Sequence, residues 1–170
     1  LESGDQVLNL TKFDIHALAA ETLELYEMSA GEKQIQLVMN KETDRMCQVK
    51  ADREQIREVL NNLVENSIKY GKSGGKTKIS FFDMDETVLI EVTDDGIGMA
   101  EEEIPRVFER FYRVDKSRSK DTGGTGLGLS IVKHGAQLHN ADLRLKSTPG
   151  KGTVITLLFP DPKDNVTPQA

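Results

Sequence analysis

The stretch DREQIREVLNNLVENSIKYG, residues 52–71, decides the fold that the sequence predicts. Its apolar residues recur at steps of three and four, a spacing that predicts an α-helix with one buried face. The residues on that face are Ile56, Val59, Leu60, Leu63, Val64, Ser67 and Ile68. A core is therefore expected on one side of this helix.

The polar side of the same helix carries an ordered stripe. Asn62, Asn66 and Lys69 fall within about 60° of one another on a helical wheel, flanked by Glu65 and Tyr70. Exposed helix faces usually carry Lys, Glu and Arg, because amides are mediocre helix formers. Two asparagines beside a lysine suit a cation next to an anionic group. Taken alone, the stripe fits an ordinary solvent-exposed face equally well.

Length and composition predict one compact domain. The chain has 170 residues, of which 37% are hydrophobic and 29% charged, as is typical of globular proteins. No apolar run approaches the ~20 residues that a membrane-spanning helix needs. The formal net charge of −6 argues against a broad nucleic-acid surface. The single cysteine, Cys47, excludes an internal disulfide and a cysteine-based zinc site, and suits a reducing compartment.

The rest of the chain predicts helices that alternate with strand pairs. The expected strands are residues 7–11, 35–39, 46–50, 76–83, 87–94, 141–147 and 152–160, the last six forming three consecutive hairpins. The expected helices are residues 13–29, 52–71 and one that begins at residues 124–128, with a short helical turn within 101–111. This order predicts an α/β fold: a two-layer sandwich in which about three helices cover one face of a mixed, mostly antiparallel sheet.

Asp94 ends the expected strand at residues 87–94, in which Val88, Ile90 and Val92 alternate on one face. Continued alternation puts the Asp94 carboxylate at the rim of the core. An unpaired buried carboxylate is costly, so a donor is expected either from the protein or from a ligand. The glycines of DDGIG, residues 94–98, fit a tight turn or a ligand-binding loop.

Residues 108–128 have the composition of a lid followed by an anion-binding helix start. The apolar anchors and basic residues are Phe108, Phe111, Tyr112, Arg110, Arg113, Lys116, Arg118 and Lys120. This composition predicts a mobile lid with a hydrophobic hinge, and a solvated charged loop is the alternative. Glycines in GTGLG, residues 124–128, leave backbone N–H groups available at the positive end of a helix. Each glycine costs about 1 kcal/mol of helix propensity, which favours a phosphate site.

These features can line one pocket between the helices and the sheet. The pocket would offer an acceptor for an amine, amides for a metal, and N–H groups with a lysine for phosphates. Neither the P-loop pattern nor the dinucleotide-binding pattern is present. The sequence therefore predicts a Mg-nucleotide site of another kind.

Five blocks of the sequence resemble the N, G1, F, G2 and G3 blocks of sensor histidine kinases, in that order. They are ENSIKYG after VLNNLV, DDGIGM, FERFYRVD, GGTGLGLSIVK and TPGKGTVITLLFP. The resemblance covers residues 7–160 and implies a catalytic ATP-binding domain with a Bergerat-type fold and an ATP lid, in the superfamily of gyrase, Hsp90 and MutL ATPases. Residues 1–6 resemble the end of an upstream helix or linker. Residues 161–170 are expected to form a disordered tail.

The resemblance implies ATP and Mg²⁺ as ligands and assigns roles by position. Asn66 matches the Mg²⁺ ligand, and Asp94 matches the acceptor for the adenine amine, with Gly96 and Gly98 below it. Other positions that match contacts to the nucleotide or its phosphates are Asn62, Lys69, Tyr70, Gly124, Thr125, Gly126, Leu127 and Gly128. Phe108 and Phe111 match the lid hinge, and Arg113, Arg118 and Lys120 match lid residues that reach the γ-phosphate. The expected catalytic residues are Asn62, Lys69 and Arg113.

In such kinases the γ-phosphoryl group passes in line to a histidine on a separate dimerisation helix, and the protein mainly positions groups and neutralises charge. His16, His134 and His139 all lack the sequence context of the acceptor. The expected partners are therefore upstream dimerisation helices and the receiver domain of a response regulator, without nucleic acid. The fragment is expected to be monomeric, the full-length protein a homodimer, and this domain the cytoplasmic part of a membrane-anchored sensor.

Two alternatives remain open from the sequence. The first is an ATP-hydrolysing conformational switch of the same superfamily, in which a glutamate that activates water takes the position of Asn62. The second is a non-catalytic module that senses nucleotide or docks a partner. All five blocks are intact, which argues against loss of activity.

Overall fold

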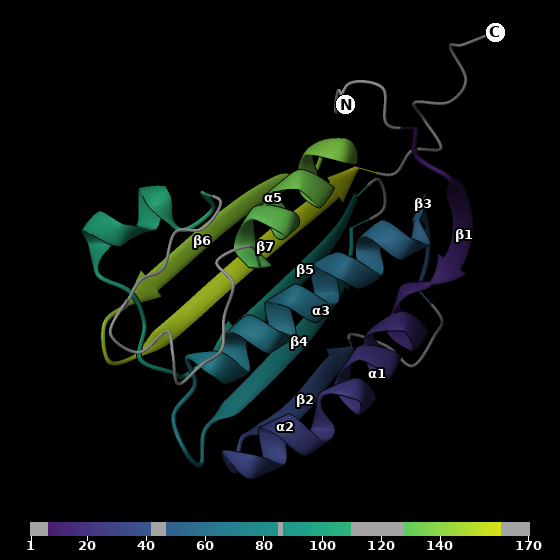
Figure 1. The fold of residues 1–170 in the computed structure, drawn as a ribbon. Coiled ribbons are helices and arrows are strands. Elements are labelled where there is room, and N and C mark those ends of the chain that lie inside the picture. Colours follow the sequence, from purple (N-terminus) through teal and green to yellow (C-terminus); the bar gives the residue numbers. More distant parts are fainter. Residues whose placement is uncertain (1–6, 42–46, 85–86, 110–127, 161–170) are drawn as a thin grey trace, which may run out of the picture.

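The computed structural model describes residues 7–41, 47–84, 87–109 and 128–160. Helices lie against one face of a five-stranded sheet, so the molecule has two layers (Figure 1). In sheet order the strands are β2 (Gln36–Lys41), β4 (Lys76–Asp83), β5 (Thr87–Asp94), β7 (Gly152–Pro160) and β6 (Asp142–Thr148). Only β2 and β4 pair in parallel, whereas the other pairs are antiparallel. The predicted two-layer α/β sandwich is confirmed.

The helical layer is centred on α3, which crosses the sheet between α1 and α5 (Figure 1). The helices are α1 (Ile15–Leu25), α2 (Glu27–Glu32), α3 (Arg53–Lys69) and α5 (Gly128–Leu138), with a 3-10 helix, η2 (Glu101–Arg106). All seven residues expected on the buried face of α3 are buried. Its N-cap is Asp52, whose carboxylate accepts from the Gln55 N–H at 3.2 Å. Among the described residues, none of these helices has the length and apolar composition to cross a membrane.

The N-terminal elements differ in their bounds from the prediction. The strand expected at residues 7–11 is β1 (Leu10–Asp14), and Phe13 is a buried strand residue instead of the start of a helix. The side chain of Asp14 caps α1, because it accepts from the His16 N–H at 3.1 Å. The continuous helix expected at residues 13–29 is divided at Tyr26, whose ψ of 6° leaves the helical range.

The hairpin expected from residues 35–39 and 46–50 is wrong. The strand β2 pairs in parallel with β4, and β3 (Gln48–Asp52) pairs with β1 in a separate two-stranded sheet. Alternating apolar residues correctly indicated two strands there. They carry no information about the partner of each strand, which depends on distant segments that cover the same core.

The remaining strand pairs are confirmed. Hairpins β4/β5 and β6/β7 form as expected, and β5 pairs with β7 to join them. The helical turn expected within residues 101–111 is η2. Helix α5 ends before Asn140, which adopts the left-handed conformation with φ of 56°.

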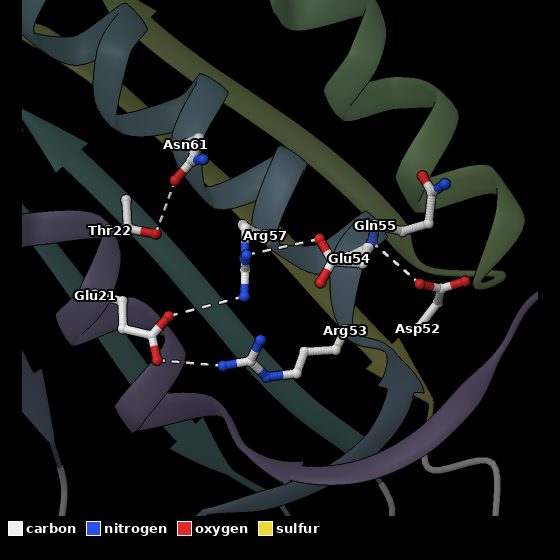
Figure 2. Close-up of polar contacts among 8 residues, drawn as sticks. All are labelled: Glu21, Thr22, Asp52, Arg53, Glu54, Gln55, Arg57 and Asn61. Atoms are coloured by element: carbon white, nitrogen blue, oxygen red, sulfur yellow. Dashed lines mark hydrogen bonds and ion pairs between the residues drawn. The ribbon is translucent and has the colours of Figure 1, made fainter. Parts of the chain in front are cut away.

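A polar interface holds α1 against α3 (Figure 2). The hydroxyl of Thr22 donates to the Asn61 side-chain oxygen at 3.0 Å. The carboxylate of Glu21 lies 3.2 Å from a guanidinium nitrogen of Arg53 and 3.8 Å from one of Arg57. Asn61 is therefore engaged in packing two helices, unlike the neighbouring amides of the predicted polar stripe.

Candidate functional site

A pocket lies where the C-terminal end of α3 meets the end of β5 and the start of β7. Its lining residues are Asn66, Tyr70, Asp94, Gly98, Met99 and Thr153. The first four were predicted from the sequence. One residue of the α3 stripe, the Tyr70 that flanks it and the last residue of β5 thus share one concave surface.

Asp94 is the half-buried acidic group of this pocket. Its Oδ1 accepts from the Gly96 N–H at 2.9 Å, and the Thr153 N–H also donates to the carboxylate. The pKa of Asp94 is raised to about 6, mainly by burial and to a smaller extent by the nearby charge of Asp95. The two N–H donors act in the opposite direction and lower the pKa, but burial has the largest effect. At neutral pH the carboxylate is ionised and can accept hydrogen bonds from a ligand in the pocket.

The sheet register places Asp94 between two threonines. It pairs with Thr77 of β4 on one side and with Thr153 of β7 on the other. The Thr77 hydroxyl is fully buried and lies 2.8 Å from the hydroxyl of Ser67 on α3. These hydroxyls join the start of β4 to α3, directly beside Asp94 in the sheet, and each satisfies the hydrogen-bonding capacity of the other.

The loop after Asp94 packs tightly against two other segments. A Cβ atom on Gly96 would lie 2.2 Å from the Tyr70 carbonyl oxygen. At Gly98, φ is +71°, and a Cβ atom would lie 2.1 Å from the Thr148 carbonyl oxygen. Close backbone packing therefore requires both glycines, as a tight turn does. The same loop lines the pocket through Gly98 and Met99, so the two interpretations of DDGIG are compatible.

The stripe on α3 extends from the pocket toward the start of α5. Asn66 lines the pocket, whereas the Asn62 amide donates to the Glu58 carbonyl at 2.7 Å. The Asn62 side-chain oxygen would lie 3.3 Å from a Cβ atom on Gly128, the first residue of α5. The Lys69 ammonium lies 5.9 Å from the centre of the Tyr70 ring. The Asn62 amide therefore lies beside the first residue of α5, and the Lys69 ammonium lies at the other end of the stripe, beside Tyr70.

Several predicted residues lie outside the part of the chain that the structure describes. They are Phe111, Arg113, Arg118, Lys120, Gly124, Thr125, Gly126 and Leu127. The lid and the phosphate loop therefore stay predictions, as does the disordered tail at residues 161–170. Phe108 packs against the hydrophobic core and is not among the residues that line the pocket.

Sequence reasoning missed two pocket residues, Met99 and Thr153. Met99 is buried, and its N–H donates to the Ser147 hydroxyl at 2.8 Å. That hydroxyl in turn lies 2.7 Å from the Thr153 hydroxyl. The pairing of Asp94 with Thr153 comes from two segments almost sixty positions apart in the sequence, and no local pattern reveals it.

The described residues contain no cluster of three or more His, Cys, Asp or Glu side chains that could hold a metal ion. Asn66 supplies an amide oxygen, which is a ligand type that Mg²⁺ accepts. Mg²⁺ usually keeps several waters and binds through one or two protein ligands together with substrate phosphates, so a single amide fits this metal.

Comparison with known proteins shows which family the chain resembles. Residues 51–163 match the family model of the histidine kinase-, DNA gyrase B- and HSP90-like ATPases. Over 164 residues the chain is 39% identical to the sensor-like histidine kinase SenX3 of Mycolicibacterium smegmatis, covering 96% of this chain and 42% of that protein. The chain thus spans less than half the length of this relative.

Two solved structures share the fold. Full-length ShkA in complex with AMPPNP has a TM-score of 0.79 and 26% identity, with 91% of this chain and 32% of that chain covered. The histidine kinase ThkA in complex with the response regulator protein TrrA has a TM-score of 0.71 and 26% identity, with 89% and 42% covered.

Proposed function

Since the chain belongs to the histidine kinase-, DNA gyrase B- and HSP90-like ATPase family, we propose that it binds Mg-ATP and donates the γ-phosphoryl group to a histidine on a separate dimerisation domain. It is a histidine kinase catalytic domain of the two-component sensor type. The proposal extends this to the chemistry of the site, to the location of the acceptor and to the relay of the phosphoryl group to a response regulator.

The observation that carries the proposal is the placement of Asp94 and Asn66 in one pocket. The ionised carboxylate can accept from the exocyclic amine of adenine, and its two N–H donors hold it in place. The Asn66 amide lies on the α3 stripe that leads toward Gly128, where the phosphates would lie. Base recognition is thus assigned to a strand end, and metal binding to a helix, of one pocket.

Phosphoryl transfer needs positioned groups and neutralised charge more than covalent chemistry from the protein. Bound Mg²⁺ would supply charge neutralisation at the phosphates. In this proposal Lys69 adds a positive charge beside them, and Asn62 orients them near the start of α5. Arg113, Arg118 and Lys120 of the lid are proposed to complete the charge compensation around the γ-phosphate.

The acceptor histidine is proposed to lie outside this chain. His16 is buried and packs edge-on against Phe81, with ring centroids 5.1 Å apart. His139 accepts from the Asp52 N–H at 3.1 Å and hydrogen-bonds the Gly135 carbonyl at 2.9 Å. Both rings are engaged in structural contacts, and His134, like the other two, lacks the sequence context of the acceptor. Dimerisation helices upstream of this chain are therefore proposed to carry the acceptor, in a sensor anchored to the membrane with this domain in the cytoplasm.

The partner for the next step is proposed to be a response regulator, as in the solved complex of ThkA with TrrA. An ATP-hydrolysing switch is less well supported, because an amide at Asn62 cannot accept a proton from water as a carboxylate does. Its side chain is also bonded to the Glu58 carbonyl.

Phosphotransfer to the dimerisation helices tests the proposal. The chain is incubated with Mg²⁺, ATP labelled at the γ-phosphate, and the dimerisation helices of the same protein supplied in trans. The expected result is phosphohistidine on the helices and no label on this chain. Label on His16, His134 or His139 would contradict the assignment of the acceptor. Bound ATP without phosphohistidine would favour the non-catalytic module, and phosphate release that is lost in Asn62→Ala would favour the hydrolysing switch.

A further inference from the structure

The C-terminal end of α3 is closed by a lysine from a distant part of the chain. The Lys33 ammonium donates to the carbonyl oxygens of Ile68 at 2.8 Å and of Lys69 at 3.0 Å. The last carbonyls of a helix lack i+4 donors within the helix and carry the negative end of its dipole. The Ile68 carbonyl also accepts from the Gly71 N–H at 3.1 Å, so the lysine adds to a backbone turn at this end. A half-buried ammonium with two such acceptors is a strong form of this contact.

The backbone around Lys33 is itself held against the segment that follows α3. The Gly74 N–H donates to the Lys33 carbonyl at 3.2 Å. The next residue, Gln34, adopts the left-handed conformation with φ of 60° and turns the chain from α2 into β2. A Cβ atom on Gly71 would lie 2.6 Å from the Ile35 side chain. The backbone of Lys33 is therefore held close to the end of α3.

The end of α3 in turn supports the wall of the pocket. Tyr70 follows the two capped carbonyls directly, and its own carbonyl accepts from the Ile97 N–H at 3.0 Å. The Ile97 carbonyl accepts from the Gly150 N–H at 2.7 Å. The Lys72 ammonium donates to the Gly150 carbonyl at 2.6 Å. These bonds form a closed ring through three segments, so the Tyr70 carbonyl is one of the contacts that position the loop that follows Asp94.

We propose that Lys33 is a positioning residue for adenine recognition, because its ammonium holds the last turn of α3 in the position from which Tyr70 supports the 96–99 loop. The inference rests on the proposed function and deepens it. Lys33 is not among the residues that line the pocket. Removal of the Lys33 ammonium should displace the 96–99 loop relative to the Asp94 carboxylate. The expected consequence is a change in which base the pocket prefers.

The test compares two nucleotides that differ at the amine that Asp94 would recognise. Dissociation constants of ATP and of inosine triphosphate, which lacks the amine, are measured by calorimetry in Mg²⁺ for each variant. In Lys33→Met the preference for ATP is expected to fall by up to about tenfold, the value expected if displacement of the loop removes the hydrogen bond between the adenine amine and the Asp94 carboxylate. Lys33→Arg should restore the preference, because a guanidinium donates to two carbonyls. Lys146→Met, which changes an exposed lysine of β6, should leave it unchanged.

The ratio of the dissociation constants of inosine triphosphate and ATP distinguishes a positioning role of Lys33 from an effect on stability alone. A purely structural role of Lys33 would lower the melting temperature and the active fraction, and both nucleotides would be affected equally. An unchanged ratio in folded Lys33→Met would overturn the inference. Should that variant fail to fold, Lys33→Ala, which removes the donor without adding a longer apolar side chain, is measured in the same way, and an unchanged ratio would again overturn the inference. Wild-type protein that binds no ATP would overturn the proposed function itself, an outcome distinct from an unchanged preference.

Discussion

The backbone N–H of Gly96 donates to Oδ1 of Asp94 over 2.9 Å. The glycine that allows the loop to pack on the Tyr70 carbonyl therefore also orients the carboxylate of the pocket. This hydrogen bond favours the ionised form of Asp94, whereas burial favours the protonated form and has the larger effect. The ionised Asp94 carboxylate therefore lowers the stability of the fold at neutral pH. The same ionised form is the one that can accept a hydrogen bond from an amine.

We expect Asp94→Asn to stabilise the domain at pH 8 and to have less effect at pH 4. The folded-state pKa of about 6 lies above the ordinary value of 3.8. The stability that the protonated carboxyl contributes is therefore fully present below pH 4 and is lost as pH rises through 6. Solvent screening at this partly exposed group limits the gain to about 1 kcal/mol. Urea unfolding of the wild type and of Asp94→Asn between pH 4 and 8 measures the difference in their free energies of unfolding. Parallel pH profiles of the two proteins would contradict the raised pKa of Asp94.

The same titration should appear in nucleotide binding. ATP affinity of the wild type should fall as pH decreases through about 6, because protonation removes the charge on the acceptor. At pH 8, Asp94→Asn should bind ATP about tenfold more weakly, as expected for loss of a hydrogen bond to a charged group. Calorimetry at pH 5 and 8 measures both effects. Asp94→Asn is the control for protonation of the nucleotide phosphates, because its amide does not titrate. The same pH dependence of ATP affinity in wild type and variant would exclude Asp94 as the titrating acceptor.

Two asparagines of α3 provide a matched pair of variants. Asn66→Ala should lose about tenfold of the Mg²⁺-dependent gain in ATP affinity, corresponding to ~1.4 kcal/mol, because its amide faces the pocket. Asn61→Ala removes the hydrogen bond to Thr22 at the α1–α3 interface (Figure 2). It should cost about 1 kcal/mol of stability without changing Mg²⁺ dependence. Titrations with Mg²⁺ and with a chelator distinguish the two, and equal Mg²⁺ dependence in both variants would remove Asn66 as a ligand.

Alanine substitutions at Gly98 and at Gly31 should change the stability of the domain in opposite directions. Gly98→Ala would place a Cβ atom 2.1 Å from the Thr148 carbonyl at a positive φ, and we expect a loss of more than about 2 kcal/mol. Gly31 lies in α2 with open space around the added atom. Gly31→Ala should stabilise the domain by about 0.5–1 kcal/mol. Chemical unfolding gives both values, and a tolerated Gly98→Ala would contradict the packing of the loop.

Much of this architecture could be predicted from local patterns. The helix α3, the β4/β5 and β6/β7 hairpins and the inward face of Asp94 follow from periodicity and turn residues. The partners of β2 and β3 could not be predicted, because pairing between distant strands has no local signal. Thr153 was missed for the same reason. Lys33 was missed because its bonds to the end of α3 depend on the parallel packing of β2 against β4.

The central claim is that Mg-ATP binds between the end of α3 and the loop that follows Asp94. The most direct measurement is an amide nuclear magnetic resonance titration of the chain with ATP and Mg²⁺. We predict the largest shifts at the N–H groups of Tyr70, Gly96, Met99 and Thr153, and small shifts along α1 and α2. Shifts absent from this pocket, or concentrated on α1 and α2, would contradict the account.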